Sequence, residues 1–150
     1  VGVNICFDNW LPESGRLVAL QGAEVLIAPY VWSVGPWDSP PDHAARNRAW
    51  KDYAGRTFPA RAIDNGMFLV AINEYGTTSP REGTNFGNPV VMVYSPLGQL
   101  IAESPDEADD EVMVVAELDR ELLRERRSQG VFHPRFRRPE LYGLLSEVGD

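Results

Sequence analysis

Cys6 is the residue of this chain best suited to covalent chemistry. It ends the apolar run VGVNI, which is typical of a buried strand, and it precedes Asp8, Pro12 and Glu13, which favour the start of a helix. A cysteine at such a turn is exposed at the sheet edge near the positive end of a helix dipole, which favours the thiolate. The backbone N–H of Phe7 could then stabilise an oxyanion. The alternative is that Cys6 is only a small buried apolar residue, and position alone favours that interpretation.

Other chemistry is scarce in the sequence. The two histidines, His43 and His133, lie far apart, and with a single cysteine no spacing resembles a zinc site. We therefore expect no metal and no cofactor. One cysteine cannot form an internal disulfide, which suits a reducing cytoplasm, and we expect a cytoplasmic protein. The net charge of −8 argues against nucleic acid as a partner, and no apolar run approaches the ~20 residues that would cross a membrane.

The hydrophobic pattern predicts an α/β protein with a mixed sheet in one domain, residues 1–150. Residues 1–7 and 24–30 are expected as buried strands on either side of a helix that is capped by Asp8 or Asn9. This is a βαβ unit, so the two strands should be parallel. The remaining expected elements are a helical stretch 43–65 divided at Pro59, a strand 67–73, a hairpin of 89–94 with 99–104, a last strand 112–118 and a helix 120–127.

Several short motifs occur in the order found in one family. The run from Val3 to Asp8 followed by Pro12-Glu13 resembles the nucleophile elbow of the nitrilase superfamily, the carbon–nitrogen hydrolases. The other matching motifs are Gly22-Ala-Glu24 with a strand ending at Pro29, Arg61-Ala-Ile-Asp64-Asn65 with Asp64 in place of the usual Glu, Ser95-Pro-Leu-Gly98, and the tail Arg137-Arg-Pro-Glu-Leu-Tyr142. Each motif is weak alone, but their shared order across nearly all of the chain is specific.

The resemblance implies an α-β-β-α sandwich and hydrolysis of a non-peptide carbon–nitrogen bond. In the family, the cysteine forms a thioester with the substrate, a Glu acts as general base and a Lys supports the tetrahedral intermediate. Phe7-Asp8 after the cysteine looks like the amidase and carbamoylase branches, because true nitrilases usually have Trp and Glu there. Some carbamoylases follow the elbow with two arginines that hold a substrate carboxylate, and Asn9 and Trp10 stand at those positions here.

The resemblance also implies that the chain is only the C-terminal half of such a domain. The family's Glu and Lys precede the cysteine, whereas five residues precede Cys6 here, so we expect both upstream in a longer natural protein. The sole lysine, Lys51, is expected to be a solvated helix residue, and Glu13 to order the helix N-terminus. Tyr30 and Trp32 follow the second strand, where the family lines its substrate pocket. They are expected to bind substrate, although core or dimer-interface packing would explain them as well.

Two other functions fit the same motifs. The chain could be a catalytically inactive nitrilase-like binding or scaffold protein, or a glutaminase-like module that feeds a synthetase. The helix after the elbow, the helix ending near Asn65 and the C-terminal tail resemble the family's dimer-forming elements. A homodimer or a higher homo-oligomer is therefore expected, with a small-molecule amide as substrate.

Overall fold

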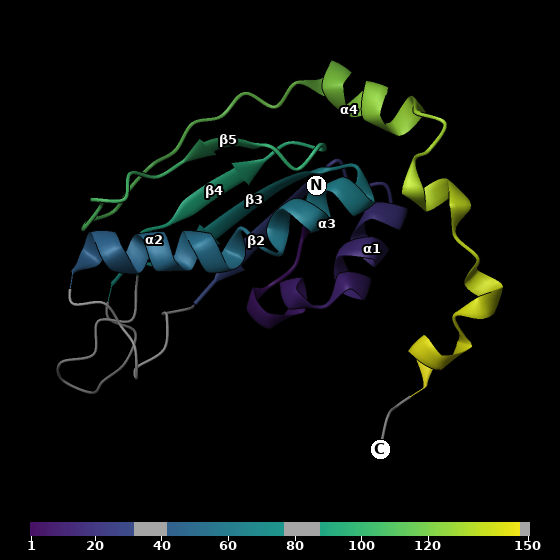
Figure 1. Ribbon diagram of the computed structural model, residues 1–150, viewed down its shortest axis with the longest axis horizontal. Coiled ribbons are helices and arrows are strands. Elements are labelled where there is room, and N and C mark those ends of the chain that lie inside the picture. The colour runs from purple at the N-terminus through teal and green to yellow at the C-terminus, as the bar shows by residue number, and fades with distance from the viewer. Residues whose placement is uncertain (32–41, 77–87, 148–150) are drawn as a thin grey trace.

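The computed structural model describes residues 1–31, 42–76 and 88–147, which form a mixed sheet with helices packed against it (Figure 1). In the described residues the strands are β1 (Gly2–Val3), β2 (Val25–Tyr30), β3 (Phe68–Asn73), β4 (Val91–Tyr94) and β5 (Leu100–Glu103), in that spatial order. The α-helices are α1 (Pro12–Leu20), α2 (His43–Ala54), α3 (Phe58–Asn65) and α4 (Arg120–Ser128). Short 3₁₀ helices are η1 (Cys6–Trp10), η2 (His133–Phe136), η3 (Pro139–Leu141) and η4 (Gly143–Ser146).

The strand pairing confirms the predicted βαβ unit and the predicted hairpin. β1 pairs with β2 and β2 with β3 in parallel, whereas β3–β4 and β4–β5 are antiparallel. The turn between β4 and β5 contains Gly98 at a φ of 76°, a backbone conformation that glycine adopts without a steric penalty. Because β1 and β2 are parallel, their carboxyl ends lie at the same end of the sheet. Cys6 follows β1 at this end, and Tyr30 is the last residue of β2.

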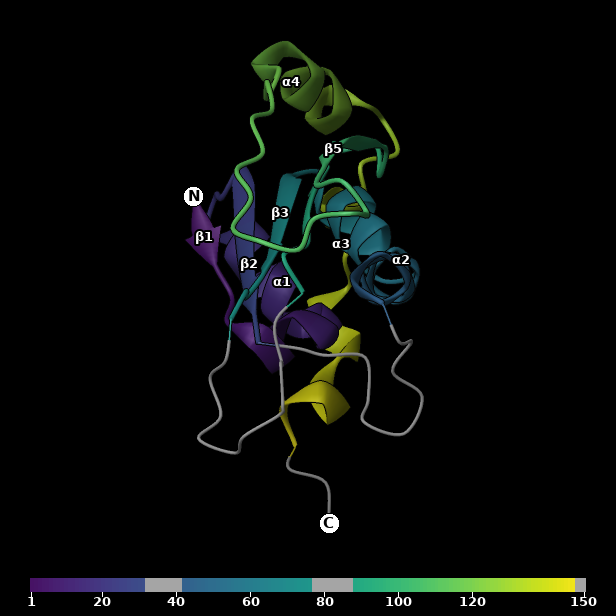
Figure 2. The same ribbon diagram turned by 90° about the vertical axis from the view of Figure 1, so that its left-hand side faces the viewer.

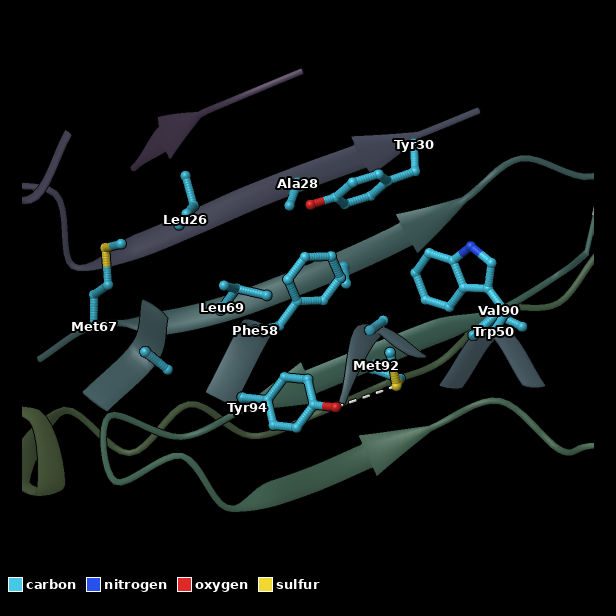
Figure 3. Close-up of a cluster of buried hydrophobic side chains, with 13 residues drawn as sticks. Leu26, Ala28, Tyr30, Trp50, Phe58, Met67, Leu69, Val90, Met92 and Tyr94 are labelled. Atoms are coloured by element: carbon cyan, nitrogen blue, oxygen red, sulfur yellow. Dashed lines mark hydrogen bonds between the residues drawn. The ribbon is translucent and has the colours of Figure 1, made fainter. Parts of the chain in front are cut away.

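The core lies between the sheet and the helices α2 and α3, with α1 at its margin. Every second residue of β2 faces this core, so Leu26, Ala28 and Tyr30 are buried while their neighbours are partly exposed. Trp50 of α2 and Phe58 of α3 are completely buried against them, as Figure 3 shows. Pro59 stands in the first turn of α3, so the predicted division of the helical stretch 43–65 is confirmed.

Three predicted details are wrong. The first strand ends at Val3, because the backbone turns at Cys6 and η1 begins there. Neither Asp8 nor Asn9 caps α1, whose N-cap is Leu11 followed by Pro12, because both residues are already inside η1. Residues 112–118 are not a strand, although their burial alternates as it does in a strand. A strand needs hydrogen bonds to a neighbouring strand, and none of the described strands pairs with these residues.

Arginines hold the C-terminal segment to the body. Arg127 donates to the carbonyls of Gly66 and Ala23, and Arg126 donates to that of Ile63. Beyond α4 the chain runs past α3 and α1 (Figure 1), with Leu141, Leu144 and Leu145 largely exposed. Among the described helices, none combines the length and apolar character that crossing a membrane requires.

Candidate active site

Cys6 is the one non-glycine residue of the described chain with a positive φ, at 50°. For a residue with a Cβ this left-handed conformation is strained, and strain of this kind concentrates at functional sites. It produces the sharp reversal by which the chain leaves β1 and enters η1. The side chain is partly buried and packs against the margin of the hydrophobic core. The expected strand-to-helix turn is therefore present, with the cysteine at its apex.

Asn9 holds this turn in shape. Its side-chain amide donates to the carbonyl of Asn4 at 2.7 Å and to that of Cys6 at 3.1 Å, and the residue is 2% exposed. A second tie comes from Arg61, whose guanidinium donates to the carbonyl of Trp10 at 3.2 Å. Sequence reasoning missed both roles. The available signal was that asparagine in a turn bonds to nearby backbone, but only the fold brings Arg61 to η1.

Phe7 lies directly after Cys6 in η1, with its side chain 66% exposed. Its N–H is in the first turn, where a helical N–H has no acceptor within the helix. A carbonyl carbon bound to the Cys6 sulfur would carry its oxygen close to such a donor, which is the geometry of an oxyanion hole. The oxyanion role of Phe7 stays a prediction.

Tyr30 is 2% exposed and belongs to the hydrophobic core cluster. Its ring is 5.0 Å from that of Phe58 and 6.0 Å, edge-on, from that of Trp10. Burial raises the pKa of the Tyr30 hydroxyl above its ordinary value; the charge of Cys6 adds to this effect and that of Arg61 opposes it. Tyr30 is therefore part of the core against which Cys6 packs. Trp32, the other expected substrate-binding residue, lies outside the described residues.

Lys51 is not the solvated helix residue that was expected. Its side chain is 10% exposed, and its ammonium group contacts the Ser104 carbonyl at 2.5 Å, Asp106 at 2.7 Å and Glu103 at 3.1 Å. These partners belong to β5 and the segment after it, whereas Cys6 follows β1 at the opposite edge of the sheet. Lys51 thus joins α2 to β5. Its position agrees with the expectation that it is not the family's catalytic lysine.

A surface cavity that does not include Cys6 lies between α1, α3 and the C-terminal tail. Its volume is about 620 Å³. Its lining includes Glu13, Leu17, Leu20, Arg61, Asn65 and Leu145. Glu13 is in the first turn of α1, where a negative side chain complements the helix dipole, as expected. Within residues 1–31, 42–76 and 88–147, no three His, Cys, Asp or Glu side chains gather to hold a metal ion.

Comparison with known proteins adds the family and the extent of the match. The sequence model of the carbon–nitrogen hydrolases matches residues 1–128. The N-carbamoylputrescine amidase of Arabidopsis thaliana is 34% identical over 97% of this chain and 46% of its own length. The citrullinase of Francisella tularensis is 34% identical over 95% of this chain and 46% of its own. A carbon–nitrogen hydrolase from Helicobacter pylori superposes with a TM-score of 0.78 at 28% identity, over 97% of this chain and 48% of that one.

The chain therefore spans about half the length of the relatives that it matches. The mixed sheet with its helices agrees with the fold that the motifs implied, and the partial coverage agrees with one part of a larger sandwich. The elbow and the motif of residues 61–65 both fall within the matched region, where the structure joins them through the Arg61–Trp10 hydrogen bond.

Proposed function

Because the chain belongs to the carbon–nitrogen hydrolase family, we propose that its protein hydrolyses an amide or N-carbamoyl substrate with Cys6 as the nucleophile. The observation that carries this proposal is the strained, left-handed backbone of Cys6 at the apex of the β1–η1 turn. The name of the Arabidopsis relative supports an N-carbamoyl group as one substrate class.

In the proposed reaction the Cys6 sulfur attacks the carbonyl carbon, and the electron pair of the C=O bond moves to oxygen. The Phe7 N–H donates to that oxygen while it carries negative charge. The C–N bond then breaks, the nitrogen takes a proton and leaves as ammonia or an amine, and a thioester remains on Cys6. Water adds to the thioester, the carbon–sulfur bond breaks, and the acid leaves with the Cys6 thiol restored.

The general base and the supporting cation are proposed to be a Glu and a Lys outside these 150 residues. Lys51 is occupied by three partners at the opposite edge of the sheet from β1, and Glu13 lies in the first turn of α1. The relatives are about twice as long as the matched chain, which leaves room for both residues.

The sheet supports the same proposal, because its strands are apolar on both faces. Away from the helices β2 and β3 present Ile27, Val70 and Ile72, and Ile72 is 38% exposed. Strands of this composition are normally covered on both faces. A second sheet from another part of the protein would complete the sandwich.

We also propose a homodimer or a higher homo-oligomer that works in the cytoplasm. The exposed leucines of α1, Leu17 and Leu20, lie beside the cavity together with Leu145 of the tail, and such clustered apolar side chains are typical of an interface. The single free cysteine agrees with a reducing compartment.

The test of function is Cys6→Ala in the protein as its gene encodes it. Ammonia release from a simple aliphatic amide and from an N-carbamoyl amine should fall by about a thousandfold or more, because no other group replaces the nucleophile. The melting temperature should change little, and Cys6→Ser, which keeps the shape with a poorer nucleophile, should also be inactive. Turnover that survives in Cys6→Ala would contradict the nucleophile assignment. A folded natural protein without turnover on either substrate class would favour a binding role.

A further inference from the structure

The 3₁₀ helix η1 has Cys6 as its first residue and Trp10 as its last. Figure 2 shows this dark purple segment leaving β1 and coiling below the strands before the chain enters α1. Its backbone is held by a hydrogen bond from the Asp8 N–H to the Ile5 carbonyl at 3.2 Å, and by one from the Leu11 N–H to the Asp8 carbonyl at 3.3 Å. A 3₁₀ helix has poor hydrogen-bond geometry, so contacts from outside have to fix this turn.

Two side chains hold the two ends of η1. At the start, the amide of Asn9 donates to the carbonyl of Cys6. At the end, the Nη2 of Arg61, in the middle of α3, donates to the carbonyl of Trp10 at 3.2 Å. The carbonyls in the last turn of a helix have no donor within the helix, and an arginine can supply one. Arg61 therefore caps the C-terminal end of the helix that carries Cys6.

The guanidinium of Arg61 lacks the partner that usually accompanies such a charge. No ion pair of the described residues includes it, and its Nε is buried without a hydrogen-bond partner in that part of the chain. Arg16 lines the same cavity but donates to the carbonyl of Asp64, which belongs to α3 and not to η1. A partly buried charge without a counter-ion is a cost to folding, so the position of Arg61 needs a reason other than stability.

We propose that Arg61 is a positioning residue, which fixes the end of η1 and so holds the Cys6 sulfur and the Phe7 N–H where the reaction needs them. This role rests on the proposed function, in which Cys6 is the nucleophile, and it adds a residue from another helix that touches no reacting atom. A misplacement of about 1 Å in a reacting group can slow a reaction by a factor of a hundred. One hydrogen bond at the far end of so short a helix is therefore enough to matter.

The ring of Trp10 provides a second anchor for the same residue. It stacks on the ring of Phe58 with centroids 5.3 Å apart, and it lies 5.0 Å from the ring of Tyr53 and 6.0 Å from that of Tyr30. These contacts hold the side chain, whereas the hydrogen bond from Arg61 holds the peptide plane. The two anchors can be separated, because a substitution at Arg61 leaves the ring in place.

The test compares Arg61→Met with Arg16→Met in the natural gene product. Each variant removes one guanidinium from the lining of the same cavity and keeps an unbranched stem, but only the first removes the donor to η1. Alkylation by iodoacetamide, a neutral reagent, is followed by mass spectrometry of the Cys6 peptide at several pH values. Arg61→Met should slow alkylation at neutral pH about tenfold and move the half-maximal rate to higher pH, because the relaxed turn no longer favours the thiolate. Arg16→Met should leave both quantities unchanged.

The melting temperature separates positioning from a purely structural role. Because Arg61 has no counter-ion in the described part of the chain, Arg61→Met should keep or raise the melting temperature while Cys6 becomes less reactive. Alkylation that is unchanged in Arg61→Met, or slowed only to the extent that the protein unfolds, would overturn the proposal. An equal effect of Arg16→Met would overturn it too, because that arginine does not contact η1.

If Arg61→Met does not fold, Arg61→Gln decides, since its amide is polar toward the cavity but too short to reach the Trp10 carbonyl. The same loss of reactivity is expected, and an unchanged rate would overturn the proposal. Alkylation follows the sulfur and not turnover. A protein that hydrolyses no amide but shows the Arg61 effect would therefore refute the proposed function and still support the positioning role.

Discussion

At the scale of single residues, the candidate site depends on a cysteine in a conformation that it does not favour. The left-handed backbone of Cys6 costs about 1–2 kcal/mol for a residue with a Cβ, so neighbouring contacts have to compensate. Asn9 provides them, because one amide group ties the carbonyls before and at the turn together. The reactivity of Cys6 should therefore depend on Asn9, whose amide is neither a nucleophile nor a general acid or base.

Asn9→Ala should lower the free energy of unfolding by about 1–3 kcal/mol, because one buried and one partly buried carbonyl lose their donor. It should also slow alkylation of Cys6, because the turn relaxes. Urea unfolding and alkylation kinetics measure the two effects. Asn9→Asp keeps the size but sets a carboxylate against two carbonyl oxygens, so it should be at least as harmful. An Asn9→Asp protein as stable and reactive as the original would show that the amide donor is unimportant.

At the scale of elements, the tail docks where α3 ends. Gly66 terminates α3 at a φ of 55°, and a Cβ placed there would lie 2.5 Å from the Phe132 ring. The residue therefore serves both as the left-handed C-cap and as the space that receives the segment after α4. Gly22 also has a positive φ, of 95°, but nothing lies within 4 Å of a Cβ built on it.

Gly66→Ala should cost more stability than Gly22→Ala, since only the first adds a clash to the backbone strain, which is about 1–2 kcal/mol. Urea unfolding of both variants gives the comparison. Replacing Phe132 with Ala should remove the extra cost of Gly66→Ala, so the double-mutant cycle should show coupling between the two positions. Additive effects would mean that the tail does not pack against Gly66.

At the scale of the whole molecule, several apolar surfaces are left open. They include the sheet face away from the helices, residues Met113 and Val115 at 87% and 82% exposed, and the leucines around the cavity. An arrangement of this kind is typical of a chain that buries these surfaces against other protein. If the cavity surface binds a second copy of the chain, the mass of the protein in solution should show it.

Light scattering of the natural gene product should give at least twice its single-chain mass. Leu17→Glu should shift the protein toward monomer, because a charge would be buried in the interface. The arginines nearby, Arg16 and Arg61, should make the same change tolerable in the monomer. Leu97→Glu, in the turn between β4 and β5 and also exposed, should leave the mass unchanged. A monomeric natural protein would contradict the proposed assembly.

The sequence by itself determined the local features of this protein. Apolar runs predicted the parallel βαβ unit and the hairpin, and Pro59 predicted the division between α2 and α3, because strand period, turn chemistry and proline geometry act over few residues. The motif order identified the family and predicted Cys6 as its nucleophile. Predictions that depended on a partner element were less secure: residues 112–118 alternate as a strand does, but pairing requires a second strand.

Only the tertiary structure decided which distant groups meet. Lys51 joins β5 instead of facing solvent, Arg61 reaches Trp10, and Cys6 packs against the core cluster that contains Tyr30. No periodicity encodes these contacts, because each depends on how whole helices pack on the sheet. The left-handed backbone of Cys6 belongs to the same class: a cysteine has no intrinsic preference for it, and the contacts of Asn9 and the fold around the turn impose it.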